Sequence, residues 1–297
     1  MNINKFTIIS ILFLISASTF SQSLLWKISG KGLKKPSYVY GTIHIQDKRV
    51  FSFEPIVEEK LKECNAYSME VLLDELDKES IQNAMLMKDV TLDKLMSKED
   101  YDFLDKFIKE KTGMSLFLFN KTKPFFIMSQ VMQAGMSKDK EMPLDLYFLD
   151  LAHKANKKTL GIEKFEEQMA AVDQISLQEQ VRMLLESAKD TVKESDSFDK
   201  LLEAYLSENL DQMLTLSNDS TMPANFNEAF LTNRNVRMAQ QIAKFSKKQT
   251  TFNAIGAAHL GGTKGVLELL RKKGFTVEPV PFKFQDTNPF YDDFRQD

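Results

Sequence analysis

Two of the three histidines of this chain occur in the same short motif, Gly-x-x-His. The copies are residues 41–44 (GTIH) and 256–259 (GAAH). With 11 glycines and 3 histidines in 297 residues, chance would produce only about 0.1 copies. An imidazole can ligate a metal ion or transfer a proton near neutral pH, and glycine permits a sharp turn or a close approach of another group. The duplicated motif therefore predicts a functional site that uses both His44 and His259.

Two carboxylates end apolar segments in the same way as the histidines. Glu70 closes residues 67–70 (YSME), and Glu163 closes residues 160–163 (LGIE). A glutamate in an apolar strand costs free energy unless it is paired or binds a metal. Together with the two histidines, these residues form a nitrogen and oxygen donor set that suits Mn, Co, Fe or Zn better than a thiolate-binding metal.

Six short segments rich in β-branched and aromatic residues are predicted to be strands that position these side chains. The first two, residues 24–29 and 37–43, are separated by a glycine-rich turn and predict a hairpin or adjacent strands. The others are residues 65–72, 158–163, 250–255 and 275–280. All four candidate site residues lie at or just beyond the carboxyl end of a predicted strand, the edge at which open α/β sheets build their sites.

The order strand, loop, helix, strand occurs near both ends of the chain, in residues 38–71 and 250–280. Each copy predicts a βαβ unit with a parallel pair of strands. Helical periodicity dominates the middle of the chain, apart from the strand at 158–163. We therefore predict an α/β fold: a mixed sheet from the N- and C-terminal halves, with a large helical insertion at about residues 74–249.

The first 21 residues are predicted to be a signal peptide. An apolar run at residues 7–17 is followed by Thr19 and Ser21, which favour cleavage before Gln22. The run is shorter than the roughly 20 residues that a membrane-spanning helix needs. We expect residues 22–297 to form a single exported domain, periplasmic or secreted, with no stable membrane insertion after cleavage.

The composition excludes several other classes of protein. A formal net charge of -3 provides no basic surface for a nucleic acid. The single cysteine, Cys64, excludes an intrachain disulfide and any CxxC motif. His153 is predicted to lie exposed at a helix end, and the helical row Met128, Met132 and Met136 is predicted to belong to the core.

Taken together, these segments resemble the TraB/PrgY/GumN family, which also contains the TIKI metalloproteases. The resemblance extends over most of residues 24–280, and its motifs are specific in combination. They are LLWKIS, YVYGTIH, AYSMEV, Lys123-Pro124-Phe125, Leu144-Asp145, GIEKFEEQ, Thr232-Asn233-Arg234-Asn235 and FNAIGAAHLGGTKGVLELLRKKGFTVEPV. Met142-Pro143 departs from the more polar, glycine-containing approach to the aspartate that relatives often have, which puts the role of Asp145 in question.

The resemblance implies a fold like that of erythromycin esterases and the haem-binding ChaN proteins. For the TIKI branch it implies metal-dependent peptide hydrolysis that needs both Gly-x-x-His histidines and an acidic residue. Carried over by position, the metal ligands are His44, Glu70 and His259, and the further family positions are Glu163, Asp145 and Arg234.

On this basis we expect one divalent ion, Mn, Co or Zn, to activate water for hydrolysis of a peptide or protein. Glu163 would be a fourth ligand or the general base, and Arg234 would orient a carboxylate or stabilise the oxyanion. Two alternatives remain open. One is a metal-free hydrolase with histidine as general base, and the other is a non-enzymatic protein that binds haem or a peptide in the same crevice.

Overall fold

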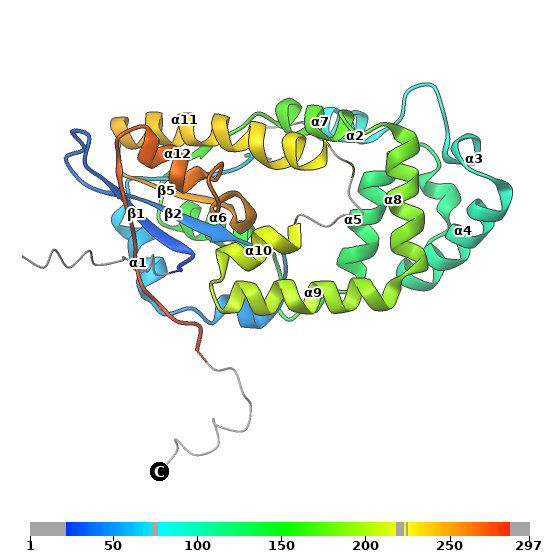
Figure 1. The fold of residues 1–297 in the computed structure, drawn as a ribbon, viewed down its shortest axis with the longest axis horizontal. Coiled ribbons are helices and arrows are strands. Elements are labelled where there is room, and N and C mark those ends of the chain that lie inside the picture. Colours follow the sequence, from blue (N-terminus) through cyan, green and yellow to red (C-terminus); the bar gives the residue numbers. More distant parts are fainter. Residues whose placement is uncertain (1–21, 73–76, 218–222, 224, 286–297) are drawn as a thin grey trace, which may run out of the picture.

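The computed structural model describes residues 22–72, 77–217, 223 and 225–285 (Figure 1). The predicted signal peptide, residues 1–21, lies outside this part of the chain. No helix among the described residues is long and apolar enough to cross a membrane.

A six-stranded mixed sheet in the order β4-β3-β5-β2-β1-β6 forms the centre of the fold. Its strands are β1 (Leu25–Ser29), β2 (Ser37–Thr42), β3 (Ala66–Met69), β4 (Lys158–Gly161), β5 (Thr251–Gly256) and β6 (Thr276–Pro279). Strands β4, β3, β5 and β2 are parallel to one another, whereas β1 is antiparallel to both of its neighbours, β2 and β6. The prediction of an α/β fold with a mixed sheet is confirmed, as is the hairpin of β1 and β2.

The two strands of each predicted βαβ unit run in the same direction, as expected, but the prediction that they pair with each other is wrong. Strands β2 and β3, joined through α1 (Ile56–Glu63), are separated by β5, and strands β5 and β6, joined through α12 (Val266–Lys272), are separated by β2 and β1. The sequence pattern indicates the direction in which a strand returns, but the place in the sheet is set by long-range packing. The C-terminal half inserts β5 between two strands of the N-terminal half, so that the two Gly-x-x-His motifs become neighbours.

Helices cover both faces of the sheet. Helix α1 and helix α6 (Leu144–Lys154) precede β3 and β4 in right-handed crossovers and lie on one face, whereas α11 (Asn233–Lys248) and α12 pack together on the other (Figure 1). On the α6 face, the ring of Tyr40 meets that of Phe148 edge-on at 5.2 Å, and Phe252 stacks beside Tyr40 at 6.2 Å. These buried rings form the centre of the main hydrophobic core.

A second hydrophobic cluster lies in helices remote from the sheet (Figure 1). Its buried residues include Leu104 and Ile108 on α4 (Lys98–Thr112), Ile127 on α5 (Pro124–Ala134) and Leu184 on α8 (Leu177–Lys189). The remaining helices are α2 (Lys78–Met85), α3 (Leu92–Leu95), α7 (Phe165–Asp173), α9 (Thr191–Leu206) and α10 (Leu210–Ser217). Between residues 78 and 248, β4 is the one strand in the described ranges.

Candidate functional site

The four predicted site residues on strand ends lie along one edge of the sheet. In the register of the parallel strands, Thr42 of β2 faces Gly256 of β5, and Met69 of β3 faces Ala254 of β5 and Gly161 of β4. The residues that follow these positions are, in order across the sheet, Glu163, Glu70, His259 and His44. The expected positions of the two motifs, at the carboxyl ends of strands of one sheet, are thus those observed.

The first glycine of each motif is required by close contacts, since neither has a positive φ. A Cβ atom at Gly41 would lie 2.7 Å from Cδ1 of Leu260 and 3.1 Å from Cα of Ala257, which belongs to the second motif. A Cβ at Gly256 would lie 3.2 Å from Oε1 of Glu70. Glycine therefore lets the two motifs and the Glu70 carboxylate approach one another.

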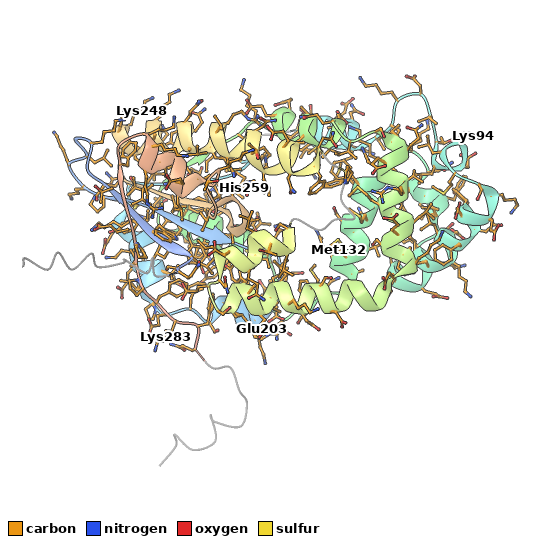
Figure 2. The ribbon with its side chains drawn as sticks, in the orientation of Figure 1. Lys94, Met132, Glu203, Lys248, His259 and Lys283 are labelled. Atoms are coloured by element: carbon orange, nitrogen blue, oxygen red, sulfur yellow. The ribbon has the colours of Figure 1, made fainter. Side chains whose placement is uncertain are left out.

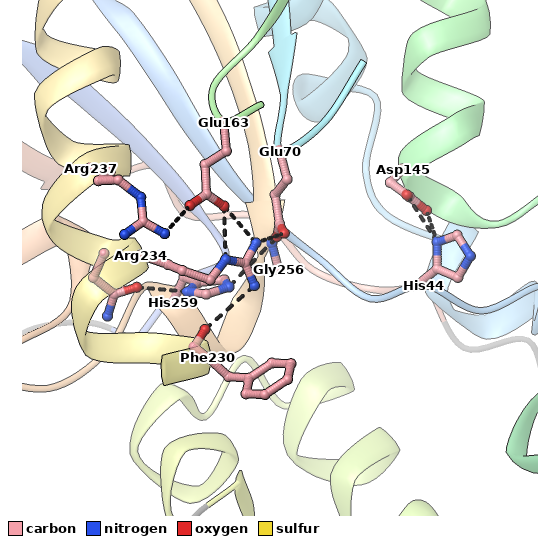
Figure 3. A network of polar contacts seen from close by, with 10 residues as sticks. His44, Glu70, Asp145, Glu163, Phe230, Arg234, Arg237, Gly256 and His259 are labelled. Carbon is pink, nitrogen blue, oxygen red and sulfur yellow. Dashed lines mark hydrogen bonds and ion pairs between the residues drawn. The ribbon is translucent and has the colours of Figure 1, made fainter. Parts of the chain in front are cut away.

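Glu70, Arg234 and Glu163 form an ionic cluster on the β3 and β4 side of this edge, in which Arg234 and Glu163 are buried and Glu70 is partly buried (Figure 3). Nε of Arg234 donates to Oε2 of Glu163 at 2.8 Å, and one of its terminal nitrogens donates to Oε2 of Glu70 at 2.6 Å. Arg237, one helical turn later, donates to the other oxygen of Glu163 at 3.1 Å. The backbone N–H of Gly256 donates to Oε1 of Glu70 at 2.7 Å. Both carboxylates are therefore held in one orientation by charge-assisted hydrogen bonds.

These contacts keep Glu70 ionised. Burial raises the pKa of its carboxyl, but the charge that His259 carries at low pH, the charge of Arg234 and the N–H of Gly256 outweigh burial and lower the pKa to about 2. Burial lowers the pKa of Arg234, and this effect is outweighed by the two carboxylates, which raise it. The cluster is thus an arginine shared between two carboxylates.

His259 is buried next to this cluster in a single tautomer. Asn235 donates from Nδ2 to the backbone carbonyl of Lys264 at 2.9 Å, which turns its Oδ1 toward Nδ1 of His259 at 2.6 Å. Because an amide oxygen only accepts, Nδ1 of His259 must carry the proton when the ring is neutral. Nε2 then presents a lone pair, 3.8 Å from Oε1 of Glu70. Burial, reinforced by Arg234 and opposed by Glu70, lowers the pKa of His259 to about 4, so the ring is neutral at pH 7.

His44 forms a separate pair with Asp145 (Figure 3). Its Nδ1 lies 2.8 and 2.9 Å from the two carboxylate oxygens, and 54% of its side chain is exposed. Asp145 occupies the first turn of α6, two residues after the capping position of Pro143, and the hydroxyl of Tyr67 donates to its backbone carbonyl at 3.1 Å. The hydrogen bond that His44 donates to Asp145 raises the pKa of His44 despite partial burial, and the charges of Asp145 and Glu70 raise it further. Met142-Pro143 therefore does not prevent Asp145 from reaching this site.

An open cleft of about 470 Å³ begins at His44. Its other walls include the end of α4, the short 3-10 helix Leu116–Phe119 and the C-terminal half of α5. The prediction that Met128, Met132 and Met136 belong to the core is wrong for Met132, which is 44% exposed on α5 (Figure 2). Met128 and Met136 are partly buried and pack against the hydrophobic clusters, although Met136 also lines the cleft. The buried side of α5 is formed by Ile127 and Val131, which leaves Met132 facing solvent.

The types of donor atom at this edge suit a divalent ion, but the donor groups are not all close enough to bind one ion together. Each histidine has Nδ1 tied to a side-chain oxygen and keeps Nε2 as its second nitrogen, the arrangement usual for metal-binding histidines. Glu70 and His259 stand close enough to share one ion. However, no three histidine, cysteine, aspartate or glutamate groups lie together in a metal-binding arrangement within the described ranges.

Two contributors to the site were not assigned a role by sequence reasoning. Asn235 fixes the His259 tautomer, and Arg237 binds Glu163. Arg234 and Arg237 are three residues apart on a helix, a spacing that places both on one face and could have indicated a shared partner. His153 is exposed in the last turn of α6, as predicted. Cys64 is buried, and burial raises its pKa to about 12.

Comparison with known proteins reveals relatives over most of the chain. It is 25% identical to Metalloprotease TIKI1 of Danio rerio over 317 residues, which cover 87% of this chain and 63% of the relative. It is 24% identical to Metalloprotease TIKI2 of Xenopus tropicalis over 321 residues, with coverages of 87% and 60%, and 25% identical to Metalloprotease TIKI1 of Homo sapiens over 324 residues, with coverages of 87% and 62%.

The chain spans about three-fifths of the length of these curated relatives. No solved structure matches it. The model of the TraB/PrgY/gumN family matches residues 24–279, which include both Gly-x-x-His motifs, Glu70, Asp145, Glu163 and Arg234. The chain belongs to the TraB/PrgY/gumN family.

Proposed function

We propose that this protein is an exported metal-dependent hydrolase that cleaves peptides or proteins. The proposal rests on one observation: the two histidines lie at one sheet edge, and each has its Nδ1 held and its Nε2 left as the second nitrogen. Each has Nδ1 engaged by a side-chain oxygen, Asp145 for His44 and Asn235 for His259, while Glu70 stands ionised beside His259. The names of the relatives, metalloproteases, support the same reaction class.

In this proposal His44, Glu70 and His259 hold one divalent ion, Mn, Co or Zn, through two imidazole nitrogens and a carboxylate oxygen. A bound ion of this kind would lower the pKa of a water molecule and polarise the substrate carbonyl. Since no three such groups lie together in the part of the chain described, the proposal requires a side-chain adjustment at His44 or Glu70 when the ion binds.

The other residues hold this set in place. Asp145 and Asn235 orient the two imidazoles, and Arg234 fixes the Glu70 carboxylate. Glu163 was expected to be a ligand or general base, and Arg234 to contact an oxyanion. With only 1% of its side chain exposed and both oxygens bound by arginines, Glu163 is better suited to anchoring Arg234. The Arg234 donors are likewise occupied by internal carboxylates, and we assign both residues a positioning role.

A metal-free hydrolase is the second candidate, and the His44–Asp145 pair favours it. A half-exposed imidazole that opens onto a cleft and is held at Nδ1 by a carboxylate is suited to act as a general base through Nε2. In this version His44 takes a proton from water as the water attacks the substrate carbonyl, and Asp145 stabilises the imidazolium. His259, Glu70 and Arg234 would then be structural.

The two candidates are separated by the metal content of the purified mature protein combined with a broad peptidase assay. The proposal predicts close to one divalent ion per chain and hydrolysis that a chelator abolishes and the ion restores. Hydrolysis that persists without metal would support the His44–Asp145 mechanism instead. If the protein hydrolyses no peptide in either state, the proposal of a peptidase is refuted.

A further inference from the structure

The cleft at His44 has an apolar wall that is only partly buried against the hydrophobic clusters. Met114, Phe119 and Met136 line it, from the loop after α4, the 3-10 helix and the segment after α5. Met114 is 42% exposed, and the neighbouring Phe117 and Leu118 are more exposed still. A volume of about 470 Å³ lies within the roughly 300–1,000 Å³ of sites that bind small ligands. The cleft can therefore receive an apolar side chain together with a short length of backbone.

The charged residues of the same cleft have one sign. Lys111 and Lys138 line it, and no lining residue carries a carboxylate. Neither lysine forms an ion pair with a described residue, and Lys111 has only the ring of Phe107 beneath its ammonium group at 5.9 Å. Asp139 accepts a hydrogen bond from the backbone N–H of Lys48 at 3.1 Å and also interacts with the Ser137 side chain, and it forms no ion pair with Lys138. Positive charge at this rim is thus not neutralised by neighbours.

Between these groups, Gln130 and Gln133 line the cleft from the exposed side of α5. Their amides have no side-chain hydrogen bonds to other described residues, and each can both donate and accept. Such groups match the alternating N–H and C=O groups of an extended peptide. The cleft thus presents, next to His44, an apolar wall, two unpaired cations and two free amides.

We infer that this cleft is the subsite that selects the substrate, and that it takes a peptide segment in which an apolar side chain is accompanied by an acidic one. The inference rests on the proposed peptidase function, because it places the selected segment beside His44. The apolar side chain packs on Met114, Phe119 and Met136, and the carboxylate lies near Lys111 and Lys138.

Binding of short fluorescent peptides, followed by anisotropy in the presence of a chelator, tests this inference without depending on catalysis. Three peptides are compared: one with adjacent Leu and Glu, one with Lys in place of Glu, and one with Ser in place of Leu. At an ionic strength on the order of 0.01 M, where screening is weak, we expect the Leu-Glu peptide to bind about tenfold more tightly than either other peptide.

The charge-reversal variant Lys111→Glu/Lys138→Glu should prefer the lysine peptide, whereas the matched control Lys106→Glu/Lys244→Glu, exposed and outside the cleft, should keep the original order. Equal binding of the three peptides, no binding at all, or the same change in both variants would overturn the inference. Selective binding without hydrolysis in any metal would instead refute the proposed function and leave the subsite standing. Hydrolysis of peptides without a preference for the acidic one would support the proposed function and refute the subsite.

Discussion

The site has two halves that differ in burial and in rigidity. In one half, Glu70, Glu163 and Arg234 each make two or more side-chain hydrogen bonds, His259 makes one to Asn235, and Arg234 is 5% exposed. His44, on the neighbouring strand, has one partner, Asp145, and half of its side chain faces solvent at a cleft. Under the proposed function, the buried half would fix the geometry of the site at the expense of burying charge, and the exposed half would meet the substrate. Variants in the two halves should therefore affect different measurements.

The largest effect is expected from Arg234→Met, which leaves Glu70 and Glu163 without their shared cation. Removal of one partner of a buried ion pair typically costs about 3–5 kcal/mol of unfolding free energy, because the remaining charge is buried alone. Urea unfolding of the purified variant measures this loss. Arg237→Met is the matched control, since Arg237 is more exposed and contacts only one oxygen of Glu163. Equal losses of unfolding free energy in both variants would contradict the claim that Arg234 is the main partner of the two carboxylates.

His44→Ala should separate function from stability. We expect hydrolysis to fall by at least about a thousandfold, since a group that contacts the reacting atoms is removed. The unfolding free energy should change by less than about 0.5 kcal/mol, because the side chain is half exposed. The double variant with His259→Ala should be no less active than either single variant, and His153→Ala should resemble the wild type. A large stability loss in His44→Ala would place this residue in the structural half.

Asn235→Ala tests the tautomer of His259. Loss of the oxygen that holds Nδ1–H frees the ring to adopt the other tautomer, and such outer contacts typically alter metal affinity by about 10–100-fold. Competition with a chelating dye measures this affinity. Asn235→Asp is the comparison variant, because it keeps an oxygen acceptor for Nδ1. If both variants bind the ion equally weakly, the acceptor at this position does not control the histidine.

Asp145→Asn should produce a smaller effect, visible as a shift in pH dependence. Asp145 raises the pKa of His44 above its ordinary 6.5, so activity that needs an unprotonated Nε2 should rise with pH through this raised value. Removal of the Asp145 charge should lower the pKa of His44, so the rise in the pH–activity profile should move to lower pH. The ion pair also stabilises the fold below about pH 6.5, and this contribution is lost as the pH rises through the raised pKa. If the rise in the pH–activity profile stays at the same pH in Asp145→Asn, it does not report the titration of His44.

Local patterns in the sequence predicted the strands, the hairpin and the edge on which the candidate residues lie. This succeeded because the strands are parallel, so that their carboxyl ends lie at one edge of the sheet. A residue at or just beyond such an end is therefore placed at this edge, as are Glu70, Glu163, His44 and His259. The neighbours of each strand could not be predicted, since the insertion of β5 between β2 and β3 depends on contacts between halves far apart in the chain.

The roles of charged residues were also beyond the sequence pattern. Arg234 was expected to face a substrate, but its donors are taken by Glu70 and Glu163 from two distant strands. Met128, Met132 and Met136 were all expected in the core, but Met132 is exposed. Spacing alone does not reveal which side of an apolar helix packs against its neighbours. In both cases the missing information was the partner across space, which no spacing along the chain encodes.

Isothermal titration of the metal-free protein with Mn, Co and Zn is the most direct test of the proposed metal centre. The predicted result is one binding site for at least one of these ions in the wild type and in His153→Ala, and none in His44→Ala or His259→Ala. Retention of that site in His44→Ala or His259→Ala, or its loss in His153→Ala alone, would contradict a centre shared by the two Gly-x-x-His motifs.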